Sequence, residues 1–123
     1  MNILFVCIEN SNRSQMAEGF AKHFGNASSY SSGSRPSGKV NPKAIAAMAE
    51  LGIDISHHQS IGLDELPKLE WDWVITMGCG DACPHLPAKN RDDWALHDPR
   101  DLPPEEFNVV RDEIGTRVKK LLA

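Results

Sequence analysis

The sequence has no long hydrophobic run, no excess of basic residues and few cysteines. No apolar run approaches the roughly 20 residues that a membrane-spanning helix needs. No basic segment precedes the apolar run that begins at Ile3, so we expect neither a membrane span nor a signal peptide, and we expect a cytoplasmic location. The formal net charge of -4 argues against nucleic acid as a main partner, because nucleic-acid-binding domains usually carry a basic face.

The chain contains three cysteines, an odd number, and two of them, Cys79 and Cys83, lie close together. Without an export signal, catalytic, redox or metal-binding roles are favoured over a structural disulfide framework. The 123 residues suffice for one core and are too few for two, so we assign 1–123 to a single domain and expect a monomer.

Apolar runs and helical periodicities alternate along the chain. Buried strands are predicted at 2–7 and 73–77, a weaker strand at 28–34, and a short final strand at 94–97. Helices are predicted over 14–24, from Asn41 and Pro42 to about Leu51, briefly over 60–66, and over 104–121. This alternation predicts an α/β fold with a parallel sheet covered on both faces, in which Cys7, the Cys79 loop and Asp98 follow strands at one edge.

The segment from Cys7 to Ser14 joins the first strand to the first helix. Such a loop directs backbone N–H groups and a helix N-terminus into one small space, which favours an anion and a thiolate. Arg13 can bind two oxygens of a tetrahedral oxyanion with its planar guanidinium, and Ser14 can donate a hydrogen bond to the sulfur. Asn10 suits a left-handed backbone position. The predicted oxyanion-binding loop comprises Ile8, Glu9, Asn10, Ser11, Asn12, Arg13 and Ser14. The alternative is an inert buried cysteine beside a surface arginine.

The segment from Cys7 to Gly19 resembles the signature of the low-molecular-weight protein tyrosine phosphatase superfamily. Its Asn-Ser-x-Arg-Ser-Gln-Met-Ala-Glu run is similar to that of the arsenate reductases built on the same fold, and the likeness extends through 40–45, 52–56 and 79–81 to Asp98 and Pro99. The resemblance implies a flavodoxin-like, doubly wound sheet of four parallel strands with helices on both faces. It also implies arsenate as the substrate.

The resemblance implies a thiol–disulfide cascade. Cys7 forms a covalent adduct with arsenate, Cys79 attacks the sulfur of Cys7 and releases arsenite, and Cys83 can then attack Cys79 and carry the disulfide to thioredoxin. Only three residues separate Cys79 from Cys83, fewer than in most thioredoxin-coupled relatives, and the segment also resembles members that use a small thiol such as mycothiol. The expected reductant is therefore external, either thioredoxin or a low-molecular-weight thiol, and no bound cofactor is expected.

Other functions compete with arsenate reduction. A phosphatase of the same fold would need only Cys7, Arg13 and the general acid Asp98, which matches the Asp-Pro acid of the family. Arg100 stands where phosphatase relatives carry aromatic residues, which weakens that interpretation. Cys79 and Cys83 could instead bind zinc with His85, but no second matched ligand pair is present, so no metal is expected. A non-enzymatic thiol sensor, or two unlinked loop cysteines, are the remaining alternatives.

Overall fold

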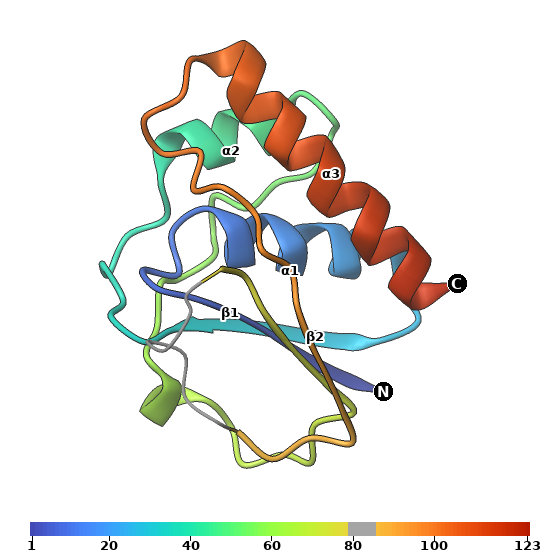
Figure 1. The fold of residues 1–123 in the computed structure, drawn as a ribbon. Helices are drawn as coiled ribbons and strands as arrows, with labels where there is room; N and C mark the ends of the chain where they lie inside the picture. The colour runs from blue at the N-terminus through green and yellow to red at the C-terminus, as the bar shows by residue number, and fades with distance from the viewer. Residues whose placement is uncertain (79–85) are drawn as a thin grey trace.

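Four parallel strands form the centre of the fold, in the order β2-β1-β3-β4. The computed structural model describes residues 1–78 and 86–123. The strands are β1 (Asn2–Cys7), β2 (Ser28–Gly33), β3 (Trp73–Thr76) and β4 (Asn90–Asp93). Because β2 and β3 both pair with β1, the chain changes direction of winding at β1, as expected for a flavodoxin-like sheet (Figure 1).

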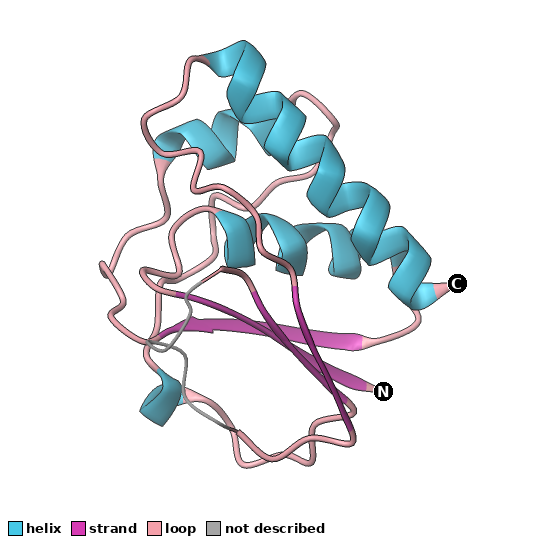
Figure 2. Cartoon of the chain, in the orientation of Figure 1, coloured by secondary structure: helices cyan, strands magenta, loops and turns pink. Residues whose placement is uncertain are grey.

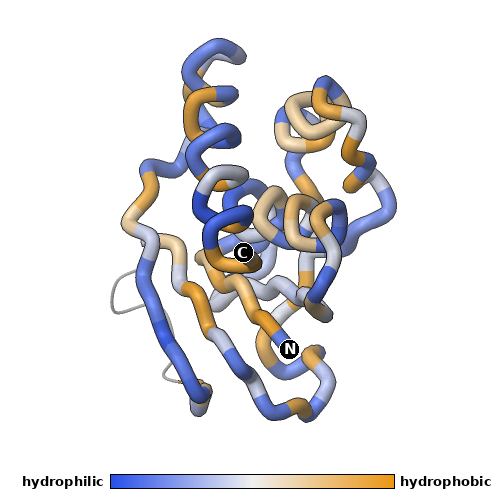
Figure 3. Tube along the Cα trace, turned by 90° about the vertical axis from the view of Figure 1, so that its right-hand side faces the viewer, coloured by the Kyte–Doolittle hydropathy of each residue, from blue (hydrophilic) through white to orange (hydrophobic). Residues whose placement is uncertain are grey.

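The three α-helices lie together on one face of the sheet (Figure 2). They are α1 (Arg13–Phe24), α2 (Pro42–Ala49) and α3 (Pro104–Leu122). Their apolar sides share one core with Ile3 and Phe5 of β1 and Ile75 of β3. Along α3, Phe107, Ile114 and Val118 are buried, and Figure 3 shows hydrophilic and hydrophobic residues alternating along the helix that leads to the C-terminus.

Among the described residues, the opposite face of the sheet is covered by one 3-10 turn, η1 (Leu63–Glu65), and by loops. Leu63 and Leu66 pack there against Leu4 and Val74, which point away from the α-helices. The short helix predicted over 60–66 is thus reduced to one turn. Helical structure is thus present on both faces of the sheet, as a 3-10 turn on one and, among the described residues, as α-helices only on the other.

The fourth strand was placed wrongly by the sequence pattern. The prediction put it at 94–97, whereas β4 is Asn90–Asp93, four exposed hydrophilic residues that pair with β3. An edge strand whose faces meet solvent has no apolar period to reveal it. Trp94, which suggested the strand, instead follows it and packs its buried ring 5.9 Å from that of Phe5.

The local sequence predicts where α2 begins more accurately than it predicts which of its residues are buried. Asn41 caps α2 as predicted, because its side chain accepts a hydrogen bond of 3.0 Å from the Lys43 N–H. The helix buries Ala44, Ala47 and Met48, whereas Ala49 is exposed. No helix in the described ranges is long and apolar enough to cross a membrane.

Candidate active site

Cys7 ends β1 at the carboxyl edge of the sheet, and its side chain is only 2% exposed. The loop that follows is held from outside by the segment after β2. The carbonyl oxygens of Ile8 and Glu9 accept hydrogen bonds from the N–H groups of Arg35 and Ser37, at 2.7 and 3.0 Å. In a planar trans peptide the N–H points opposite to the C=O, so these bonds turn the following N–H groups toward the inside of the loop.

Asn10 fixes the turn of this loop. Its φ of 51° is the left-handed conformation that the sequence predicted. The Asn10 Oδ1 accepts from the backbone N–H of Ile61 at 2.9 Å, and a backbone N–H can only donate. The amide orientation is therefore set, and the Asn10 Nδ2 must donate to Ser14 Oγ, 2.8 Å away.

Ser14 connects this chain of hydrogen bonds to Cys7. The Ser14 Oγ lies 2.8 Å from the Cys7 Sγ, and both side chains are buried. A thiolate can only accept, so in the thiolate form of Cys7 the Ser14 hydroxyl donates to the sulfur and stabilises its charge. The geometry is the one expected from the sequence for Ser14.

A second layer of polar side chains supports Asn10, and sequence reasoning missed it. Gln15 is fully buried, and its Nε2 donates to Asn10 Oδ1 at 3.0 Å and to the Gln59 carbonyl at 2.9 Å. Its Oε1 lies 2.9 Å from His58 Nδ1, which must therefore be the donor. Burial lowers the pKa of His58. His58 thus supports the loop from behind and does not line the pocket that contains Cys7.

Arg13 forms hydrogen bonds within the protein through only one nitrogen of its guanidinium group, among the described residues. Its Nη1 donates to the carbonyls of Met77 and Leu96, at 2.6 and 3.0 Å, and the side chain is buried. The Nε has no hydrogen-bond partner among the described residues, and the Nη2 lies 4.0 Å from Asp98 Oδ2. The Nε and Nη2 edge is therefore available for the bidentate contact with an oxyanion that the sequence predicted.

A pocket of about 90 Å³ opens above Cys7. The loop residues Ile8, Glu9, Ser11 and Asn12 line it together with Arg13, and Asp98 and Arg100 approach it from the segment after β4. Asp98 Oδ1 accepts from the Arg100 N–H at 3.0 Å, which fixes the position of the carboxyl group. The structure thus brings Asp98 together with Cys7 and Arg13, which lie far from it in the sequence.

The predicted second thiols, Cys79 and Cys83, lie outside the described residues, as does His85. Glu18 accepts a hydrogen bond from Ser31 and pairs with Lys22, away from the Cys7 pocket. Within 1–78 and 86–123, no group of three or more His, Cys, Asp or Glu side chains is placed to hold a metal ion.

Comparisons with known proteins agree with this architecture. Residues 2–123 match the family model described as low molecular weight phosphotyrosine protein phosphatase. Arsenate reductase 2 of Staphylococcus epidermidis is 45% identical and the arsenate reductase of Staphylococcus aureus strain Newman 47% identical, each over 95% of this chain and 92% of the relative.

Solved structures agree as well. An arsenate reductase in the phosphate binding state is 40% identical, with a TM-score of 0.87 over 98% of this chain and 95% of that one. A thioredoxin-dependent arsenate reductase of Corynebacterium glutamicum is 31% identical, with a TM-score of 0.77 over 98% of this chain and 59% of the other. Together with the site geometry, these matches show that the chain belongs to the low molecular weight phosphotyrosine protein phosphatase family.

Proposed function

We propose that this protein is an arsenate reductase that uses Cys7 as its nucleophile. The observation that carries the proposal is the pocket that Cys7 and Arg13 both line. There the Arg13 Nε has no hydrogen-bond partner among the described residues, and the Ser14 Oγ lies 2.8 Å from the Cys7 Sγ. Arsenate reductases at 45% and 47% identity support the choice of substrate.

The first step joins sulfur to arsenic. Arsenate binds with its oxygens toward the loop N–H groups and the Nε and Nη2 of Arg13. The Cys7 thiolate attacks As(V), and one oxygen leaves as water after accepting protons, for which Asp98 is the donor at the pocket edge. Arg13 and the loop groups are already oriented, so they stabilise the developing negative charge without rearrangement.

The second step transfers two electrons. The Cys79 thiolate attacks the sulfur of Cys7, a disulfide forms, and the electron pair of the S–As bond leaves with arsenic as As(III). Two thiolates are oxidised by two electrons, and As(V) is reduced by two. Cys83 then attacks Cys79 and forms the Cys79–Cys83 disulfide, which the dithiol of thioredoxin reduces. The thioredoxin-dependent relative supports this choice of donor.

The main alternatives use the same first step. A small thiol such as mycothiol could accept the arsenic adduct, and a phosphatase would let water hydrolyse a phospho-cysteine. Arg100, rather than an aromatic side chain, lines the pocket after Asp98 and Pro99, which disfavours a bulky aryl ester. We place the reaction in the cytoplasm, where thioredoxin keeps thiols reduced, and propose that the protein acts as a monomer.

Arsenate turnover measured in parallel with different reductants tests the proposal. We expect NADPH consumption with arsenate, thioredoxin and thioredoxin reductase, and little hydrolysis of p-nitrophenyl phosphate. Cys83→Ser should stop after one turnover and accumulate a Cys7–Cys79 disulfide, detectable by peptide mass under non-reducing conditions. Unchanged steady-state turnover of C83S would point to a small-thiol donor or to a different resolving residue. Brisk ester hydrolysis without arsenate-dependent NADPH consumption would identify a phosphatase.

A further inference from the structure

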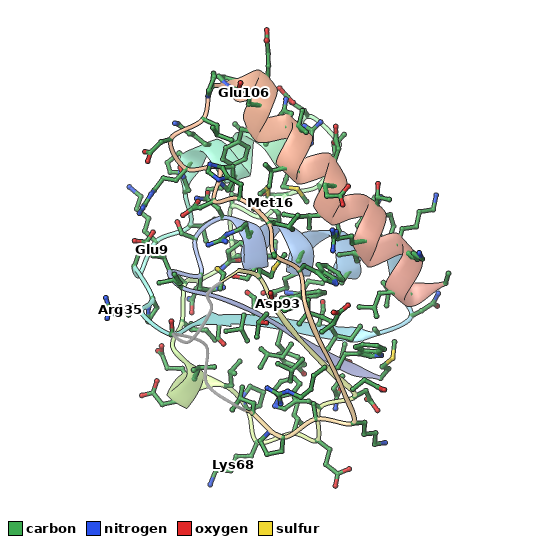
Figure 4. The ribbon with its side chains drawn as sticks, in the orientation of Figure 1. Glu9, Met16, Arg35, Lys68, Asp93 and Glu106 are labelled. Carbon is green, nitrogen blue, oxygen red and sulfur yellow. The ribbon has the colours of Figure 1, made fainter. Side chains whose placement is uncertain are left out.

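An ion pair crosses the wall of the oxyanion pocket. Glu9 belongs to the loop after Cys7, and Arg100 comes from the opposite segment, after Asp98. The Arg100 Nη1 lies 2.9 and 2.8 Å from the two carboxylate oxygens of Glu9. Both side chains line the pocket and remain partly exposed, at 39% for Glu9 and 51% for Arg100. Figure 4 shows Glu9 at the edge of the molecule, on the connection between β1 and α1.

The charge of Glu9 is unexpected in an anion site. Its carboxylate lines a pocket that must attract an oxyanion, where it opposes the positive charge of Arg13. Arg100 supplies the opposite charge within the same ion pair, so Glu9 and Arg100 together sum to zero before an anion enters. The protein carries a net charge of -4, so its overall field does not help to recruit an anion.

Two hydrogen bonds fix the backbone of Arg100 beside the pocket. Its N–H donates to Asp98 Oδ1 at 3.0 Å, and its carbonyl accepts from Lys43 Nζ at 2.9 Å. These two hydrogen bonds hold the backbone of Arg100 in place. The ion pair between Arg100 and Glu9 then joins the segment that contains Asp98 to the oxyanion-binding loop. An exposed ion pair of this kind contributes little to the free energy of folding. Its main effect is therefore on the net charge at the edge of the pocket.

We propose that Arg100 is a substrate-positioning residue that sets oxyanion affinity by cancelling the charge of Glu9 at the pocket edge. The proposal concerns anion binding in the Cys7 pocket and holds whether or not the bound oxyanion is then reduced. It predicts an order of affinities that follows the net charge of the pair, and not the presence of either side chain.

Four variants separate charge from structure. In Arg100→Gln the pair carries -1, so the dissociation constant for oxyanion should rise by about tenfold at low salt. In Glu9→Gln it carries +1, so binding should tighten by about threefold. The double variant E9Q/R100Q should return to within about twofold of wild type, and R100K should stay close to wild type. Arg91→Gln, which removes an equal charge from exposed β4, is the matched control.

Protection of Cys7 from iodoacetamide measures this binding without turnover. Inorganic phosphate is titrated on every variant, and arsenate only in a Cys79→Ser background, where no Cys7–Cys79 disulfide can form. Alkylation is followed by mass on the tryptic peptide 1–13, which contains no other cysteine. The differences between variants should shrink as salt rises from about 0.02 to 0.5 M, because the charges are exposed. If the double variant binds as weakly as R100Q, or if R100Q binds like wild type, the proposal is wrong. Protection without arsenite formation would instead reject only the proposed reaction.

Discussion

At the scale of single residues, the nucleophile depends on one directed chain of hydrogen bonds. Asn10 donates to Ser14, because the backbone N–H of Ile61 fixes the orientation of the Asn10 amide, and Ser14 donates to Cys7 when the sulfur is a thiolate, which can only accept. The signature segment predicted Ser14 and Asn10 because their partners are local. It did not predict Gln15 with His58, whose hydrogen bond spans 43 positions and leaves no local pattern.

Replacement of Ser14 by alanine tests that chain. Removal of the hydroxyl takes away a hydrogen bond to a charged sulfur, worth about 1.5–3 kcal/mol. We expect alkylation of Cys7 by iodoacetamide at pH 7 to slow by about tenfold or more, since the thiolate is the reacting species. Ser37→Ala, on an exposed loop, is the control. An unchanged rate in S14A would show that loop N–H groups alone stabilise the sulfur.

His58 gives a second residue-scale prediction, on stability. Burial lowers the pKa of His58, so the unfolded chain binds the proton first as pH falls through about 6.5. The free energy of unfolding should therefore decrease from about pH 7.5 to 5.5, and His58→Gln should show a smaller decrease. Urea unfolding at both pH values measures this.

The neighbouring exposed His57 provides the control for that measurement. His57→Gln should keep the wild-type loss of stability on acidification. An equal loss of stability in H58Q and wild type would assign the acid sensitivity to other groups. Glu18 favours the charged form of His58, and Lys22 opposes it, but burial is the largest influence.

At the scale of elements, β2 makes room for the oxyanion loop. A Cβ atom on Gly33, the last residue of β2, would lie 2.5 Å from the Ile8 carbonyl oxygen and 2.9 Å from the Asn10 nitrogen. Both neighbours are backbone atoms, so the loop itself would have to move. The strand end and the loop are thus one packed unit, although 28–34 gave the weakest strand pattern in the sequence.

Gly33→Ala should therefore damage the site more than the fold. We expect a loss of about 1–3 kcal/mol in the free energy of unfolding from overpacking. We also expect at least a tenfold weaker protection of Cys7 by phosphate, because the loop N–H groups are displaced. Ser28→Ala, at the exposed start of the same strand, should change neither quantity. Wild-type phosphate protection in G33A would show that the loop tolerates the shift.

Elements were predictable from sequence where they bury an apolar face. β1, β3 and α3 have such faces and were located within a few residues. The edge strand β4 has none, since its four side chains are exposed, and its prediction was wrong. Its position is set by pairing with β3, which only the folded sheet defines.

At the scale of the whole molecule, the sheet topology assembles the site. Cys7 follows β1, Asp98 follows β4, and Arg13 reaches the carbonyl of Met77 after β3, so three strand ends meet at one carboxyl edge. The rule for ligands in parallel sheets predicted this edge before any side chain was placed. The identity of the reaction, by contrast, depends on Cys79 and Cys83, which lie outside the described residues.

A single turnover without external reductant tests the central claim most directly. Fully reduced protein is mixed with excess arsenate, and arsenite and free thiols are counted per chain. The mechanism predicts one arsenite and the loss of two of the three thiols, with a Cys79–Cys83 disulfide in the wild type, a Cys7–Cys79 disulfide in Cys83→Ser, and neither disulfide in Cys7→Ser or Cys79→Ser. Release of no arsenite with all three thiols retained would contradict it.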